Sequence, residues 1–127
     1  MPLVIAKSIC RREFGREEVP PQFIDTLRRS LSVDLATSIK GSNLPKATKL
    51  LKVYATSPEG AMRIIHLMAT EDGTLFLLFF RNKKDKVGAN ITIHNKEFRR
   101  QLHKHLDLLK KSINEGSFFV LDENSLE

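Results

Sequence analysis

The chain has 127 residues, enough for a single domain with a buried core, and 41% of them are hydrophobic. Its apolar runs are too short to span a membrane, its first residues lack a signal-peptide pattern, and its single cysteine excludes an internal disulfide. The formal net charge is +6. These features predict one cytoplasmic domain, residues 1–127, that does not associate with membranes.

The positive charge is concentrated in the middle of the sequence. Residues 46–111 contain 14 Lys and Arg against 6 Asp and Glu, whereas residues 112–127 contain four acids and no Lys or Arg. A basic centre of this kind is typical of a protein whose partner is anionic, either a nucleic acid or an acidic protein. The alternative is a basic surface that only contacts solvent.

The first third of the chain predicts one strand and one helix. Residues 2–9 favour a short strand, and the pair Pro20-Pro21 then interrupts the chain. A helix is predicted over 21–40, ending before Gly41, because an apolar stripe runs along it through Ile24, Leu27, Leu31 and Leu35.

Three consecutive antiparallel strands are predicted next, over 50–56, 61–69 and 74–81. Residues 46–55 are also compatible with a helical turn that runs into the first of these strands. The turn between the second and third strands contains Asp72-Gly73, a strong hairpin signal.

The C-terminal part predicts a long helix over about 96–114, with Asn95 as its N-cap and Gly116 as its stop. Its apolar stripe contains Phe98, Leu102, Leu106, Leu109 and Ile113. Residues 117–127 form an apolar and then acidic tail, in which 118–121 are either a last strand or a cover for the sheet. The predicted fold is therefore α+β, a small antiparallel sheet flanked by N-terminal and C-terminal helices.

Two arginines stand at the ends of the predicted hairpin that are remote from its turn. A three-residue loop over 71–73 sets Arg63 opposite Arg81, and two like charges across a ladder favour an anion between them. A two-residue loop sets Arg63 opposite Asn82 and sends Arg81 to the other face.

The sequence lacks the patterns of the common catalytic sites. Its four histidines have no metal-ligand spacing, its cysteine has no neighbouring histidine, and it has no phosphate-binding glycine loop or nucleophile motif. No metal or cofactor is therefore expected. What remains is a cluster of cations on the predicted sheet, Lys49, Lys52, Arg63 and Arg81, followed by Lys83, Lys84 and Lys86.

Such cations can bind a phosphate or help to cleave RNA through its own 2′-hydroxyl, which needs charge stabilisation and proton transfer more than a nucleophile. His66 is a possible proton carrier, but in the favoured register it faces away from Arg63, which favours a buried core histidine. Tyr54 is suited equally to stacking on a base and to filling the core.

A lysine-bearing strand, a glycine turn, Gly-Ala-Met-Arg-Ile-Ile at 60–65 and Leu-Phe-Phe-Arg-Asn-Lys-Lys at 78–84 resemble the RelE/ParE toxin superfamily over residues 46–86. The resemblance implies a RelE-like fold and a ribosome-dependent mRNA endonuclease that arrests growth, the toxin of a type II toxin–antitoxin system. It assigns phosphate stabilisation to Arg63 and Arg81 and a supporting role, or that of base, to Lys52. The general acid or base is not matched, and the nearest histidine after these strands is His94.

The resemblance also implies the partners: mRNA, the ribosome and its rRNA, and a cognate antitoxin that forms a hetero-oligomer with the toxin. RNA contacts are expected from the basic residues around the hairpin and on the last helix, namely Lys49, Lys83, Lys84, Lys86, Arg99, Arg100 and Lys104. The alternative is a non-catalytic module of the same fold, either a gyrase-directed toxin or a nucleic-acid-binding regulator.

Overall fold

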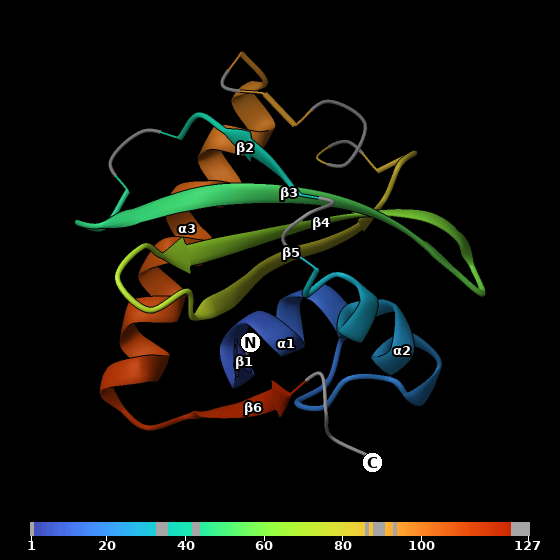
Figure 1. Cartoon of the computed structure of the whole chain (residues 1–127), viewed down its shortest axis with the longest axis horizontal. Helices are drawn as coiled ribbons and strands as arrows, with labels where there is room; N and C mark the ends of the chain where they lie inside the picture. The colour runs from blue at the N-terminus through green and yellow to red at the C-terminus, as the bar shows by residue number, and fades with distance from the viewer. Residues whose placement is uncertain are drawn as a thin grey trace.

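The computed structural model describes residues 2–32, 36–41, 44–85, 87, 91–92 and 94–122. Within these residues the chain forms one six-stranded sheet and three helices (Figure 1). The elements in chain order are β1 (Pro2–Ala6), α1 (Lys7–Phe14), α2 (Pro21–Arg29), β2 (Thr37–Ile39), β3 (Thr48–Ser57), β4 (Gly60–Ala69), β5 (Leu75–Asn82), α3 (Lys96–Asn114) and β6 (Phe118–Asp122).

The sheet is mixed, with the strand order β2-β3-β4-β5-β1-β6. The pairs among β2, β3, β4 and β5 are antiparallel, as is the pair of β1 with β6, whereas β1 runs parallel to β5. The α+β class is thus confirmed, but the expectation of a purely antiparallel sheet is wrong. A parallel pair needs a long connection, and here all the chain from α1 to β4 lies between β1 and β5.

The hairpin of β4 and β5 has the predicted arginine register but reaches it by a different route. Its loop is one residue longer than expected, because the amide of Ala69 donates to the carbonyl of Thr74. Gly73 has φ 77°, the left-handed conformation that glycine tolerates. A β-bulge between Ile65 and His66 then shifts the pairing by one residue, which brings Arg63 opposite Arg81.

Helices cover both faces of the sheet, and two neighbouring phenylalanines of β5 show the division. Phe79 contacts α3, and its ring centroid lies 5.6 Å from that of Phe98 in this helix. Phe80 points to the other face and contacts Phe14, at the end of α1, and Phe23 of α2. In Figure 1, α3 crosses behind β3, β4 and β5. The core lies between these layers and contains mostly Leu, Ile and Phe.

The N-terminal half differs most from its prediction. The strand predicted over 2–9 ends at Ala6, and α1 follows it directly. The helical spacing of Ile9, Cys10 and Phe14 and the left-handed Gly15 after them indicate this helix. The strand was predicted too long because Ile9 was assigned to it, whereas Ile9 belongs to the buried face of α1.

The helix predicted over 21–40 is also wrong in its second half. It ends at Arg29, and the hydroxyl of Ser30 bonds back to the carbonyl of Leu27. Residues 37–39 instead form β2, an edge strand that pairs with β3. Leu35, the last member of the predicted stripe, lies outside the described residues.

The remaining elements agree closely with prediction. The three central strands occupy the expected segments, with β3 extended to Thr48–Ser57, so the helical-turn alternative is wrong. Asn95 caps α3 by accepting hydrogen bonds from the amides of Glu97 and Phe98. The tail forms the edge strand β6, antiparallel to β1, as far as Asp122, and the acidic residues after it lie outside the described chain.

Candidate functional site

The hairpin of β3 and β4 carries three of the residues that matter most. Its register is continuous from the turn to the far end, and it sets Tyr54 directly opposite Arg63. Lys52 lies two residues before Tyr54 on the same strand, so the alternation of side chains puts all three on one face of the sheet. The tight turn between β3 and β4 thereby brings Lys52, Tyr54 and Arg63 together on one face of the sheet.

Lys52 and Arg63 converge on the ring of Tyr54. The Nζ atom of Lys52 lies 5.1 Å from the ring centroid, and the Cζ atom of Arg63 lies 5.2 Å from it. A hydrogen bond from Lys52 lowers the pKa of Tyr54, and the charges of Lys52 and Arg63 act in the same direction. Tyr54 is 54% exposed, so the core-filling alternative is wrong.

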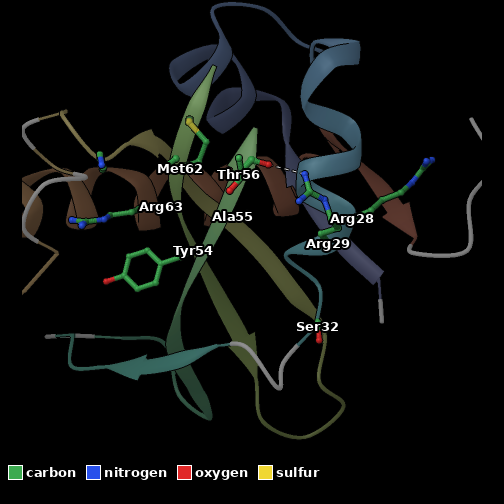
Figure 2. Close-up of a pocket in the computed structure, with 10 residues that line it drawn as sticks. Arg28, Arg29, Ser32, Tyr54, Ala55, Thr56, Met62 and Arg63 are labelled. Atoms are coloured by element: carbon green, nitrogen blue, oxygen red, sulfur yellow. Dashed lines mark hydrogen bonds between the residues drawn. The ribbon is translucent and has the colours of Figure 1, made fainter. Parts of the chain in front are cut away.

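A cavity of about 600 Å³ opens beside this cluster. Ten described residues line it, among them four cations and no Asp or Glu: Arg28, Arg29, Ser32, Tyr54, Ala55, Thr56, Ala61, Met62, Arg63 and Lys83. It follows the edge of β3 that β2 leaves uncovered, since β2 pairs with β3 only at residues 50–52. Figure 2 shows the two α2 arginines on one side of β3, and Tyr54 and Arg63 on the other.

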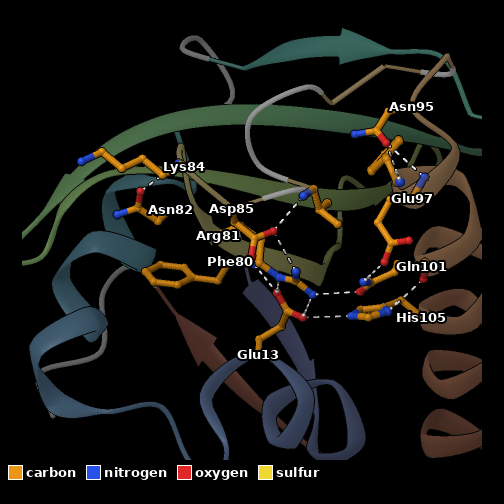
Figure 3. Close-up of polar contacts among 12 residues, drawn as sticks. Glu13, Phe80, Arg81, Asn82, Lys84, Asp85, Asn95, Glu97, Gln101 and His105 are labelled. Atoms are coloured by element: carbon orange, nitrogen blue, oxygen red, sulfur yellow. Dashed lines mark hydrogen bonds and ion pairs between the residues drawn. The ribbon is translucent and has the colours of Figure 1, made fainter.

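Arg81 has different surroundings from Arg63, although the two are paired across the strands. All three guanidinium nitrogens of Arg81 donate to oxygen acceptors of the protein (Figure 3). Nε and Nη2 donate to Glu13 of α1 at 2.7 and 2.9 Å, and Nη1 donates to Asp85 at 3.1 Å. The side chain of Arg81 is only 17% exposed.

Glu13 is the centre of this buried network. Its side chain is fully buried, and it also accepts a hydrogen bond from the amide of Phe80, at 2.8 Å. Burial alone raises the pKa of Glu13, but hydrogen bonds from His105 and Arg81 outweigh burial and hold that pKa below its usual range. The sequence predicted an anion between Arg63 and Arg81. For Arg81 the anionic partner is the carboxylate of Glu13, and Arg81 therefore lies outside the candidate site.

The other basic residues of the hairpin region are divided between the two faces. Lys83 lines the cavity, and Lys84 is exposed in the turn after β5. Lys49 lies three residues before Lys52, on the opposite face, so the expectation that both surround Arg63 is wrong. Lys86 lies outside the described residues.

The basic residues of α3 are exposed, as a contact with RNA requires. Arg99, Arg100 and Lys104 lie on its outer surface, while the apolar stripe packs on the sheet. Arg100 is paired with Glu97, at 2.6 Å.

The histidines and the cysteine lie apart from the cation cluster or are buried. His66 is fully buried, as predicted, with Nε2 3.0 Å from the hydroxyl of Ser30, and burial lowers its pKa to about 4. Burial raises the pKa of Cys10 to about 11, so its nucleophilic thiolate is scarce at neutral pH. In the described part of the chain, no three His, Cys, Asp or Glu residues are grouped as metal ligands.

Sequence reasoning missed three residues at these sites. Arg28 and Arg29 join the cavity because α2 packs beside β3, and their only sequence signal was an Arg pair near the helix end. Glu13 was missed because its helix was predicted as a strand and loop.

Comparisons with known proteins give this chain no relatives. No protein-family model, no curated protein and no solved structure matches it. Of the helices in the described ranges, none is long and apolar enough to cross a membrane.

Proposed function

We propose that this protein is a ribosome-dependent mRNA endonuclease, the cytoplasmic toxin of a type II toxin–antitoxin pair, in line with its resemblance to the RelE/ParE superfamily. One observation carries the proposal: Lys52 and Arg63 converge on an exposed tyrosine beside a cavity with four cations. A cognate antitoxin would hold it inactive in a hetero-oligomer. Exposed cations of α3, such as Arg99 and Lys104, would contact rRNA.

The proposed reaction uses the RNA's own 2′-hydroxyl as nucleophile. The O2′–P bond forms and the P–O5′ bond breaks, while one proton leaves O2′ and another reaches O5′, so the products are a 2′,3′-cyclic phosphate and a 5′-hydroxyl. Negative charge develops on the non-bridging phosphate oxygens, where the guanidinium of Arg63 offers several donors in a fixed plane. Lys52 adds positive charge or takes the proton from O2′.

Arg81 enters this proposal as a positioning residue. Its contacts with Glu13 tie α1 to the end of β5, and β5 is the strand that holds β4 and Arg63 in register. We therefore expect the loss of Arg81 to act mainly through folding, and the loss of Arg63 through chemistry.

The test is induced expression in a bacterial host, followed by mapping of message 5′ ends. We expect growth arrest and new cuts inside translated messages with the natural protein. Arg63→Ala should lower cleavage by about 10²- to 10³-fold, the usual effect of removing one donor to a developing oxyanion, with little change in thermal unfolding. Arg12→Ala is the matched control, because Arg12 is an exposed arginine of α1.

Each other outcome has a definite meaning. Equal cleavage by the Arg63→Ala variant would remove Arg63 from the site. Arrest without cuts would contradict the endonuclease and favour a non-catalytic module that acts by binding, such as a gyrase-directed toxin. Absence of arrest at comparable protein levels would contradict the toxin proposal itself.

A further inference from the structure

The most exposed aromatic side chain of the described protein is also its only tyrosine. Tyr54 is 54% exposed, whereas Val53 and Leu51, on the opposite face of the same strand, are buried. An exposed aromatic ring with two cations beside it, Lys52 and Arg63, is the arrangement found here. It is a common feature of surfaces that bind single-stranded nucleic acid, where bases stack on aromatic rings and arginine planes.

The cavity next to the ring has two kinds of lining. Ala55, Ala61 and Met62 give it apolar atoms, while Arg28, Arg63 and Lys83 bring positive charge from α2, β4 and the turn after β5. The ligand that fits this combination has a flat apolar part and an anionic part. A nucleotide has both, and a volume of about 600 Å³ is within the range of small-ligand sites.

We propose that this cavity is a subsite for one unpaired nucleotide of an RNA strand, whose base packs on Tyr54 and whose phosphate pairs with the surrounding arginines. This inference rests on the proposed function. It adds one feature of the substrate that the proposed function does not specify, an unstacked base. A duplex is excluded because its bases are stacked and paired, so that their faces cannot reach Tyr54. The site therefore selects single-stranded segments.

The chain offers a direct probe of this contact. Because it has one tyrosine and no tryptophan, its intrinsic fluorescence comes from Tyr54. A short unpaired oligoribonucleotide should quench that fluorescence, and the same sequence in a duplex should not.

Two substitutions separate stacking from the hydroxyl group. In anisotropy titrations with the labelled oligoribonucleotide, Tyr54→Phe should bind as the natural protein does, and Tyr54→Leu should bind about tenfold more weakly, the loss expected for one base–aromatic stack. Val120→Ala is the control, since Val120 is equally exposed, at 54%, but lies on the far edge strand. Unchanged thermal unfolding shows that each variant is folded.

Unweakened binding by Tyr54→Leu, or equal binding of single strand and duplex, would overturn the inference. These failures differ from failure of the proposed function. If messages are cut but Tyr54→Leu binds RNA normally, the endonuclease proposal is supported and the subsite proposal is contradicted. If the single strand binds through Tyr54 but induction produces no cuts, the subsite proposal is supported and the endonuclease proposal is contradicted.

Discussion

Arg63 and Arg81 are the same residue type at paired positions, yet their surroundings give them different roles. The guanidinium of Arg81 is bound on every nitrogen and lies against a fully buried carboxylate. Arg63 lines a cavity and flanks an exposed ring. Charge and register alone do not separate the two arginines. The decisive difference is Glu13, which α1 brings to only one of them.

The first prediction at this scale is that Arg81→Ala destabilises the protein by about 3–5 kcal/mol, because it removes the cation that donates two hydrogen bonds to the buried carboxylate of Glu13. Urea denaturation measures this change in the free energy of unfolding. Adding Glu13→Gln to Arg81→Ala should recover part of the loss, since the buried carboxylate charge is then removed as well. Arg63→Ala is the comparison, and equal stability of the two single variants would contradict the assignment.

At the scale of elements, α2 is joined to β4 by a buried polar contact. The hydroxyl of Ser30, just after α2, lies 3.0 Å from Nε2 of His66. Because burial lowers the pKa of His66 to about 4 from the ordinary 6.5, the folded protein resists protonation at this position and the unfolded chain does not. The contact is thus coupled to pH.

Which state binds the proton decides whether stability rises or falls with pH. Between pH 6.5 and 4 only the unfolded state protonates His66, so the contribution of His66 to stability is complete above pH 6.5 and falls as the pH drops towards 4. From pH 7 to pH 5 we expect a loss of about 2 kcal/mol from this residue. Urea denaturation of the natural protein and of His66→Gln at both pH values isolates it. Equal acid sensitivity of the two proteins would contradict the prediction.

At the scale of the whole molecule, the net charge of +6 is unevenly distributed. The cavity concentrates cations from three separate elements, and the basic residues of α3 add an exposed surface. Binding of a polyanion to such a surface releases counterions and weakens with salt. The contribution of an individual lysine therefore depends on which face it occupies.

Two lysines give a matched test of this arrangement. Each phosphate contact adds about −0.7 to the slope of log K against log salt concentration for a single strand. Lys83→Ala, in the cavity, should reduce the magnitude of that slope by about 0.7. Lys49→Ala, on the opposite face, should leave the slope unchanged. The same reduction from both variants would show that binding is spread over the basic surface and is not centred on the cavity.

The sequence by itself determined the elements whose signals are local. The turn at Asp72-Gly73, the cap at Asn95 and the apolar stripe of α3 specify their own backbone. The pairing of Arg63 with Arg81 was predicted as one of two registers, and it depends on a β-bulge that the sequence did not indicate. The burial of His66 followed from the same alternation. Where tertiary pairing overrode the local helical preference, as in β2, the prediction was wrong, and α1 was missed although its helical spacing is present in the sequence.

Only the tertiary structure decided which groups meet across long separations. The pairing of Arg81 with Glu13 joins positions 68 residues apart, and the parallel pair of β1 with β5 depends on the intervening chain. Periodicity predicts which face a residue occupies, but not which element covers that face. That is why the cations were found from the sequence, whereas the buried role of Arg81, the exposed ring of Tyr54 and the α2 arginines required the fold.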